Sequence, residues 1–227
     1  MTEVDRATER LLRTATTLDD TAVTAPSRLP GWSRGHVLTH VARNADAYTN
    51  LLVWARTGEE RPAYPTPTAR ADGIEAGAGR PVADQIADVR AAHGRFADAA
   101  AAMPAGAWSF FLPPTDAPAA AVPWARLREV EVHHVDLAAG YTADDWTEAF
   151  AQRLLREIVA GSTATGTAPL VLRPDGLGHT LHIGDPAGAP EVAGPIRSIA
   201  AWLAGRSDGA GLSVSPEGPL PTPTRWK

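Results

Sequence analysis

The sequence predicts an α+β protein in which a helical N-terminal domain precedes a smaller domain of mixed helices and strands. Within residues 1–144, several long stretches carry apolar residues at the 3.6-residue spacing of amphipathic helices. Residues 145–227 instead contain short β-type runs separated by turn residues. We therefore expect a four-helix bundle over 1–144 and a small α+β domain over 145–227.

Apolar periodicity places the bundle helices at residues 3–18, 33–56, 82–103 and 122–139. Ser33 is the expected N-cap of the second helix, and Pro123 suits the first turn of the fourth, where a missing N–H costs nothing. Residues 57–81 are rich in glycine, proline and charge, so they are expected to form a crossover or a lid over one end of the bundle. The loop 104–118 carries three aromatic residues and is expected to cover the bundle or line a pocket: Trp108, Phe110 and Phe111.

The C-terminal domain is expected to begin with a helix at residues 144–160. Strands are predicted at 169–173, 179–183 and 211–214, with a further helix at 195–203 between the last two strands. The proline-rich tail is expected to be extended, with Trp226 anchoring it.

The composition narrows the functional classes. The chain contains no cysteine, so a disulfide framework, a thiolate zinc site and a cysteine nucleophile are ruled out, and any thiol must come from outside. A net charge of -5 without a basic cluster argues against nucleic acid as a partner. No apolar run reaches the roughly 20 residues of a membrane span, and the N-terminus does not resemble a secretory signal. We expect a cytoplasmic monomer with small-molecule partners.

A candidate metal site lies in the fourth predicted helix. Glu129 and His133 are four residues apart and share a helix face, so both can reach one divalent cation, and Asp136 follows one turn later. Another ligand must come from elsewhere, and the best donor is the second helix. There His40 is the expected inward-facing ligand, whereas His36 lies in the first turn and is expected to pack near the helix start or to hydrogen-bond a loop.

Neighbouring residues are less suited to the same metal. His134 points about 100° away from His133, and Glu131 faces away from Glu129. Asp136 or Asn44 is the expected hydrogen-bond acceptor for a ligand histidine. The spacing alone is also typical of structural histidines and of solvated Glu–His pairs.

Two stretches resemble the signature of the mycothiol-dependent maleylpyruvate isomerase family. They are residues 29–47, LPGWSRGHVLTHVARNADA, and residues 128–137, REVEVHHVDL, within a match that covers 126–141. The resemblance implies a DinB-like four-helix bundle with a zinc site of two histidines and one carboxylate. Carried over by position, the metal ligands are His40, Glu129 and His133.

The C-terminal part resembles, more weakly, the small sterol-carrier-like α/β domain that follows the bundle in these isomerases. The similarity is concentrated in residues 199–206, IAAWLAGR. The resemblance implies a catalytic arginine in this domain, for which Arg206 is the first candidate and Arg197 the second.

The resemblance also implies a reaction. Mycothiol would be the thiol co-substrate, and a divalent metal, expected to be zinc, would activate it for reversible addition to the double bond of maleylpyruvate, giving fumarylpyruvate. The substrate is a dianion, so Arg206, Arg34 or Arg43 is expected to bind a carboxylate. Two alternatives remain: a zinc-dependent mycothiol S-transferase acting on another electrophile, and a non-catalytic metal- or ligand-binding protein.

Overall fold

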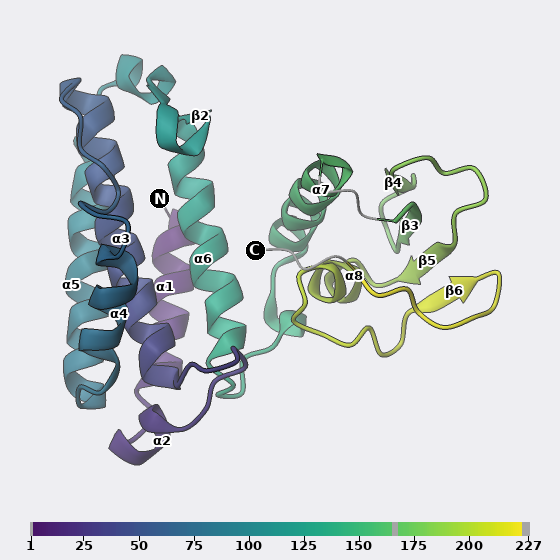
Figure 1. Ribbon diagram of the computed structural model, residues 1–227, viewed down its shortest axis with the longest axis horizontal. Helices are drawn as coiled ribbons and strands as arrows, with labels where there is room; N and C mark the ends of the chain where they lie inside the picture. Colours follow the sequence, from purple (N-terminus) through teal and green to yellow (C-terminus); the bar gives the residue numbers. More distant parts are fainter. Residues whose placement is uncertain (1, 165–167, 224–227) are drawn as a thin grey trace. The chain divides into compact units, whose positions relative to one another are not determined.

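The computed structural model describes residues 2–164 and 168–223 (Figure 1). The chain divides into two compact units, here called the N-terminal and C-terminal units, with the division between Tyr141 and Thr142. The division predicted from the sequence lies three residues later, after residue 144. Trp226, the predicted tail anchor, lies outside the described residues.

Long helices run side by side in the N-terminal unit and confirm the predicted bundle (Figure 1). They are α1 (Thr2–Ala15), α3 (Arg34–Thr57), α5 (Val82–Ala101) and α6 (Val122–Asp136). Their apolar faces form one buried cluster that includes Leu11, Leu38, Leu52, Phe96 and Val130, each fully buried. The polar site described below is built at the contact between α3 and α6.

Helix α3 begins and ends where local chemistry predicts. The Ser33 hydroxyl accepts a hydrogen bond from the His36 backbone N–H, and the His36 ring accepts one from the Ser33 backbone N–H, so both groups are satisfied as in a capping box. Gly58 follows the helix with a φ of 77°, a left-handed conformation that favours glycine. These ends fix where His40 lies along the helix.

The crossover between α3 and α5 is more ordered than expected, because it contains α4 (Ala69–Ala78). This helix lies directly against α3 at small residues. A Cβ added to Gly35 would come within 2.1 Å of the Ala78 carbonyl oxygen, and one added to Gly77 would come within 2.5 Å of Thr39. Since glycine and alanine form this contact, α4 has no stripe of large apolar residues for periodicity to detect.

Shorter elements complete the N-terminal unit. Helix α2 (Asp20–Thr24) follows α1, and β1 (Phe111–Leu112) pairs with β2 (Ala117–Pro118) in the aromatic loop. Trp108 and Phe110 pack against the bundle core, as expected for a covering loop, whereas Phe111 is 53% exposed. The 3-10 turns are η1 (Ala105–Ser109), η2 (Pro113–Thr115), η3 (Ala119–Ala121) and, at the start of the C-terminal unit, η4 (Ala143–Asp145).

The C-terminal unit combines α7 (Glu148–Ala164) and α8 (Ile196–Leu203) with a small mixed sheet. Its strands are β3 (Leu170–Pro174), β4 (Leu181–Ile183), β5 (Glu191–Gly194) and β6 (Ser213–Ser215), in the order β4-β3-β5-β6. Strands β3 and β5 are parallel and the other pairs antiparallel, with Leu172 opposite Val192. Strand β5 was not predicted, because its four residues include one β-branched side chain.

The α+β fold class is therefore confirmed. No helix in the described part of the chain is long and apolar enough to cross a membrane.

Candidate metal centre

The predicted ligands meet between α3 and α6. One nitrogen or oxygen from each of His40, Glu129 and His133 lies within 4.8 Å of the others. Glu129 Oε2 is 3.0 Å from His40 Nε2 and 3.5 Å from His133 Nε2. The two imidazole rings meet edge to face, with their centroids 4.5 Å apart. Residues separated by 89 positions in the chain thus converge on one point, as the resemblance implies.

A buried arginine fixes how α6 lies against α3 at this point. Arg126 is fully buried, and its Nη1 donates to the Val41 carbonyl oxygen and to Asn44 Oδ1, at 2.8 Å each. Burial lowers the pKa of Arg126 to about 10, and the nearby Glu129 carboxylate opposes this shift. The guanidinium therefore ties α6 to the segment of α3 next to His40, one turn before Glu129. Asn44, considered as a partner for a ligand histidine, serves Arg126 instead.

The protonation states of His40 and Glu129 suit metal binding. The His40 side chain is 2% exposed, and burial lowers its pKa to about 4, so the ring is neutral at pH 7. Burial also favours the protonated form of Glu129, but hydrogen bonds from His133 and His40 outweigh it and hold the pKa of this carboxyl well below its usual range. A neutral imidazole and an ionised carboxylate are the forms that bind a cation.

His133 is held by a second carboxylate. Its Nδ1 lies 2.9 Å from Asp136 Oδ2, and the Asp136 side chain is 2% exposed. Burial lowers the pKa of His133, but hydrogen bonds with Asp136 and Glu129 outweigh burial and raise it. The Asp136 contact leaves Nε2 of His133 directed toward Glu129, which is the usual arrangement around a metal-binding histidine.

The comparisons with known proteins identify the family. A family model described as the mycothiol maleylpyruvate isomerase N-terminal domain matches residues 4–138. The chain belongs to the mycothiol-dependent maleylpyruvate isomerase family. A search of curated proteins finds no match.

Solved structures extend the likeness to nearly the whole chain. The crystal structure of a mycothiol-dependent maleylpyruvate isomerase is 32% identical, with a TM-score of 0.92, and the match covers 99% of this chain and 95% of that one. A histidine-to-alanine mutant of such an isomerase matches with 31% identity, a TM-score of 0.91 and the same coverage. The family is one of enzymes, and both units of this chain lie within the match.

Residues on the opposite face of α6 have structural contacts in this family member. The buried Glu131 carboxylate accepts hydrogen bonds from Arg10 and from the Tyr141 hydroxyl. His134 Nε2 lies 2.7 Å from the Thr14 hydroxyl, and its ring stacks on Tyr141 at 3.6 Å. Both residues face away from the metal centre, as the helical spacing predicts.

Two arginines expected to bind substrate have other partners. Arg34 donates to the backbone carbonyls of Leu137, Ala22 and Ala138 at 2.8–3.0 Å, which ties the start of α3 to the end of α6. Arg43 forms ion pairs with carboxylates at 2.6 and 3.2 Å, so its charge is already compensated. Both guanidinium groups therefore hold the fold in this arrangement, and their binding of a substrate carboxylate stays a prediction.

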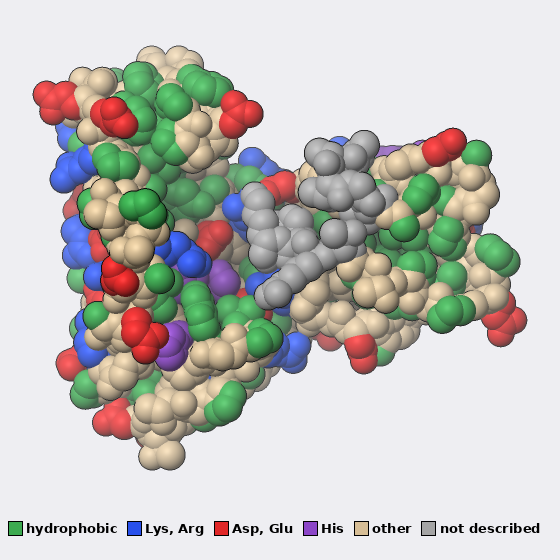
Figure 2. All heavy atoms as spheres, in the orientation of Figure 1, with side chains coloured by type: hydrophobic (Ala, Val, Ile, Leu, Met, Phe, Trp, Pro, Cys, Tyr) green, Lys and Arg blue, Asp and Glu red, His purple; other side chains and the backbone are tan. Residues whose placement is uncertain are grey.

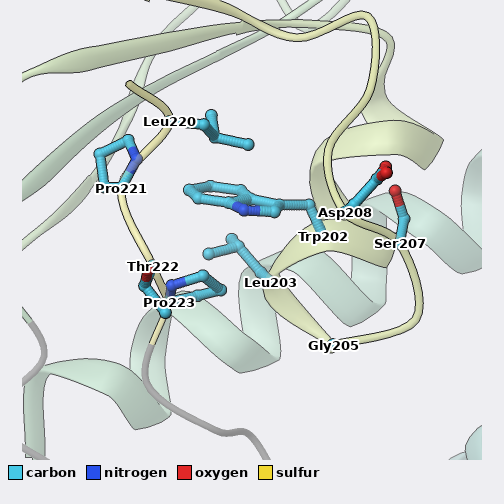
Figure 3. Close-up of a pocket in the computed structure, with 9 residues that line it drawn as sticks. All are labelled: Trp202, Leu203, Gly205, Ser207, Asp208, Leu220, Pro221, Thr222 and Pro223. Carbon is cyan, nitrogen blue, oxygen red and sulfur yellow. The ribbon is translucent and has the colours of Figure 1, made fainter. Parts of the chain in front are cut away.

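Arg206 and Arg197 lie in the C-terminal unit, and both are half-buried. Arg206 Nη1 donates to the Ala204 carbonyl oxygen at 2.8 Å. Close to it in the chain is a cavity of about 390 Å³, where the Trp202 indole lies between Leu203 and Leu220 (Figure 3). Gly205 and Ser207 line this cavity, but Arg206, between them in sequence, is not among the lining residues.

One charged residue at the metal centre was not predicted from the sequence. Arg70, on α4, places its Nη2 3.5 Å from His40 Nδ1, and its guanidinium lies over the Trp32 ring at 5.9 Å. Figure 2 shows basic, acidic and histidine side chains together on this face of the N-terminal unit. Nothing in the pattern of residues 57–81 singles out Arg70, since its position depends on how α4 lies against α3.

A cavity of about 490 Å³ lies beside the centre, along the loop before α3. Trp32 and His36 form part of its lining, and the Trp32 ring also lies 5.6 Å from the His40 ring. His36 itself pairs with Glu75 at 3.2 Å and caps α3, which agrees with its predicted role at the helix start. The volume is in the range of small-molecule sites.

Proposed function

We propose that this protein catalyses the mycothiol-dependent isomerisation of maleylpyruvate to fumarylpyruvate, with zinc held by His40, Glu129 and His133. The observation that carries the proposal is the convergence of these ligand atoms within 4.8 Å, in a chain that resembles a solved isomerase over 99% of its length. A bundle without a C-terminal unit would suit an S-transferase equally well. The similarity of both units to a solved isomerase favours the isomerase.

The donor set fits zinc. Two imidazole nitrogens and one carboxylate form a common catalytic zinc site, which leaves a further coordination position for an external ligand. When bound, the metal would lower the pKa of the mycothiol thiol and so supply a thiolate near neutral pH. The chain has no cysteine that would compete with the external thiol.

The reaction itself requires no net change in atoms or electrons. The thiolate sulfur adds to one carbon of the cis double bond, the resulting single bond rotates, and the same carbon–sulfur bond breaks to give the trans product and free thiolate. During this cycle Glu129 remains ionised and Asp136 holds His133 in orientation. We assign the bundle over residues 1–144 to the metal chemistry and Arg206, in the domain over 145–227, to substrate binding in a monomer.

The test is an isomerisation assay on metal-loaded protein, with product formation followed by chromatography. The proposal predicts turnover that requires both mycothiol and metal, that stops after chelation, and that is lost in Glu129→Gln. Accumulation of a stable thioether would instead indicate the S-transferase. Turnover that survives chelation, or a Glu129→Gln variant that keeps both metal and activity, would contradict the ligand assignment.

Arg206 has its own test. Arg206→Lys retains the charge but loses the planar fork that binds a carboxylate in two places, so we expect a lower kcat/KM with unchanged metal content. Arg173→Lys is a matched control, because that exposed arginine pairs with Glu191 on the sheet. Equal activity in the two variants would remove Arg206 from the reaction. Size-exclusion chromatography tests the monomer.

A further inference from the structure

The two ligand histidines are supported in different ways on the side away from Glu129. His133 Nδ1 faces the Asp136 carboxylate at 2.9 Å, and the carboxylate accepts a hydrogen bond from the Nδ1–H. His40 Nδ1 faces Arg70 Nη2 at 3.5 Å. A guanidinium can only donate hydrogen bonds, so Arg70 cannot do for His40 what Asp136 does for His133.

The support of His40 depends on which of its two ring nitrogens is free to bind the metal. Nε2 is the nitrogen directed toward Glu129, so Nδ1 carries the proton when Nε2 acts as a ligand. Nδ1–H of His40 and the N–H groups of Arg70 are then donors that point into the same region. Within the described residues, no other hydrogen-bond partner lies near His40 Nδ1.

Arg70 has no carboxylate partner among the described residues that would explain its position at the metal centre. Among residues 2–164 and 168–223, no carboxylate lies within ion-pair distance of its guanidinium. It is the second residue of α4, and a cation in the first turn opposes the helix dipole. Its guanidinium is instead held over the Trp32 ring and hydrogen-bonds the Tyr64 side chain. Burial raises the pKa of the Tyr64 hydroxyl, and the charge and the hydrogen bond of Arg70 oppose this rise.

We propose that Arg70 and the Nδ1–H of His40 together bind one carboxylate of the substrate, a small unsaturated dicarboxylate, and hold its double bond beside the metal ligands. The Arg70 N–H groups and the His40 Nδ1–H are donors that point into the same region, and a carboxylate supplies two acceptor oxygens for them. Arg70 is also exposed to solvent, so an anion can reach it without opening the bundle. The assignment deepens the proposed function and rests on it for the identity of the substrate.

Binding and kinetics on three variants test this assignment. Arg70→Gln removes the charge, Arg70→Lys keeps the charge without the planar fork, and Arg90→Gln is a matched control on an exposed arginine of α5. Maleate, a cis dicarboxylate, is the binding probe and is titrated into zinc-loaded protein by calorimetry without mycothiol. Steady-state kinetics then give separate KM values for maleylpyruvate and mycothiol.

We expect Arg70→Gln to weaken maleate binding and raise the KM for maleylpyruvate by about ten- to a hundredfold, as for loss of a charged hydrogen bond. The KM for mycothiol, the zinc content and, to a first approximation, kcat are expected to stay near wild type, with Arg70→Lys intermediate and Arg90→Gln unchanged. Wild-type maleate affinity in Arg70→Gln, a change in the mycothiol KM alone, or loss of zinc would each overturn the assignment.

The proposed function and the Arg70 assignment can be refuted independently of each other. If the wild-type protein does not isomerise maleylpyruvate, the proposed function is wrong, and the maleate titrations still decide whether Arg70 binds a carboxylate. If the wild type isomerises its substrate and Arg70→Gln does so with unchanged KM, the function stands and the Arg70 assignment alone is wrong.

Discussion

Replacing Asp136 by asparagine separates the charge of this residue from its hydrogen bond to His133. The contact is 2.9 Å long, and the Asp136 side chain is 2% exposed, so little solvent screens it. The amide oxygen of asparagine can still accept the Nδ1–H, which keeps the tautomer, but the stronger, charge-assisted bond is lost. Removal of such supporting partners lowers metal affinity by about 10- to 100-fold.

We therefore expect Asp136→Asn to bind zinc about tenfold more weakly, or about 1.4 kcal/mol, and Asp136→Ala to approach the hundredfold limit. Competition with a chromophoric chelator measures the affinity, and Asp98→Asn, at an exposed position of α5, is the control. Circular dichroism verifies that each variant is folded. Equal affinities in Asp136→Ala and wild type would show that Asp136 does not support the metal through His133.

Three further perturbations probe the surrounding structure. The Glu131 side chain is 2% exposed, and Glu131→Gln is expected to lose about 1–3 kcal/mol of stability in denaturant titrations while its zinc content stays normal. Loss of zinc in this variant would contradict the assignment of Glu131 to the face of α6 that points away from the metal centre. Gly35→Ala places a Cβ 2.1 Å from the Ala78 carbonyl oxygen and is expected to lower the free energy of unfolding by about 1–3 kcal/mol. Its control, Gly94→Ala, adds a Cβ in open space and should raise the melting temperature. Equal shifts in melting temperature in the two variants would be inconsistent with close packing of α4 on α3. In metal-free protein the folded-state pKa of His40 is about 4, against 6.5 in the unfolded chain, so the unfolded state takes up the proton first as the pH falls. The free energy of unfolding is therefore expected to fall by roughly 3 kcal/mol between pH 6.5 and pH 4. Urea titrations in the presence of chelator should show a smaller fall in His40→Asn, and the same pH dependence in both proteins would contradict the role of His40.

The sequence predicts the metal centre where the pattern is local. Glu129 and His133 share a face of α6 because they are four residues apart, and the same geometry turns Glu131 and His134 away. The meeting of His40 with these residues is not local, since α3 and α6 are far apart in the sequence and are joined only by tertiary contacts such as the Arg126 hydrogen bonds to Val41 and Asn44. The histidines of the second predicted helix suggested His40 as the missing ligand, and the resemblance of both stretches to one family supported that contact.

What the sequence did not reveal depends on close backbone contacts. Helix α4 packs on α3 through Gly35 and Gly77, which carry no apolar periodicity, so both the helix and the position of Arg70 were missed. The structural contacts of Arg34 and Arg43 were also not predicted, because a guanidinium that binds backbone carbonyls or neighbouring carboxylates has the same sequence signature as one that binds substrate.

The absorption spectrum of the cobalt-substituted protein, recorded before and after addition of mycothiol, is a direct test of the metal centre. We expect one cobalt per chain, a four-coordinate spectrum, and a new thiolate-to-cobalt charge-transfer band on addition of mycothiol that is absent in Glu129→Gln. A protein that binds no cobalt, or one whose cobalt spectrum does not change with mycothiol while isomerisation proceeds, would contradict the claim that His40, Glu129 and His133 hold the metal that activates the thiol.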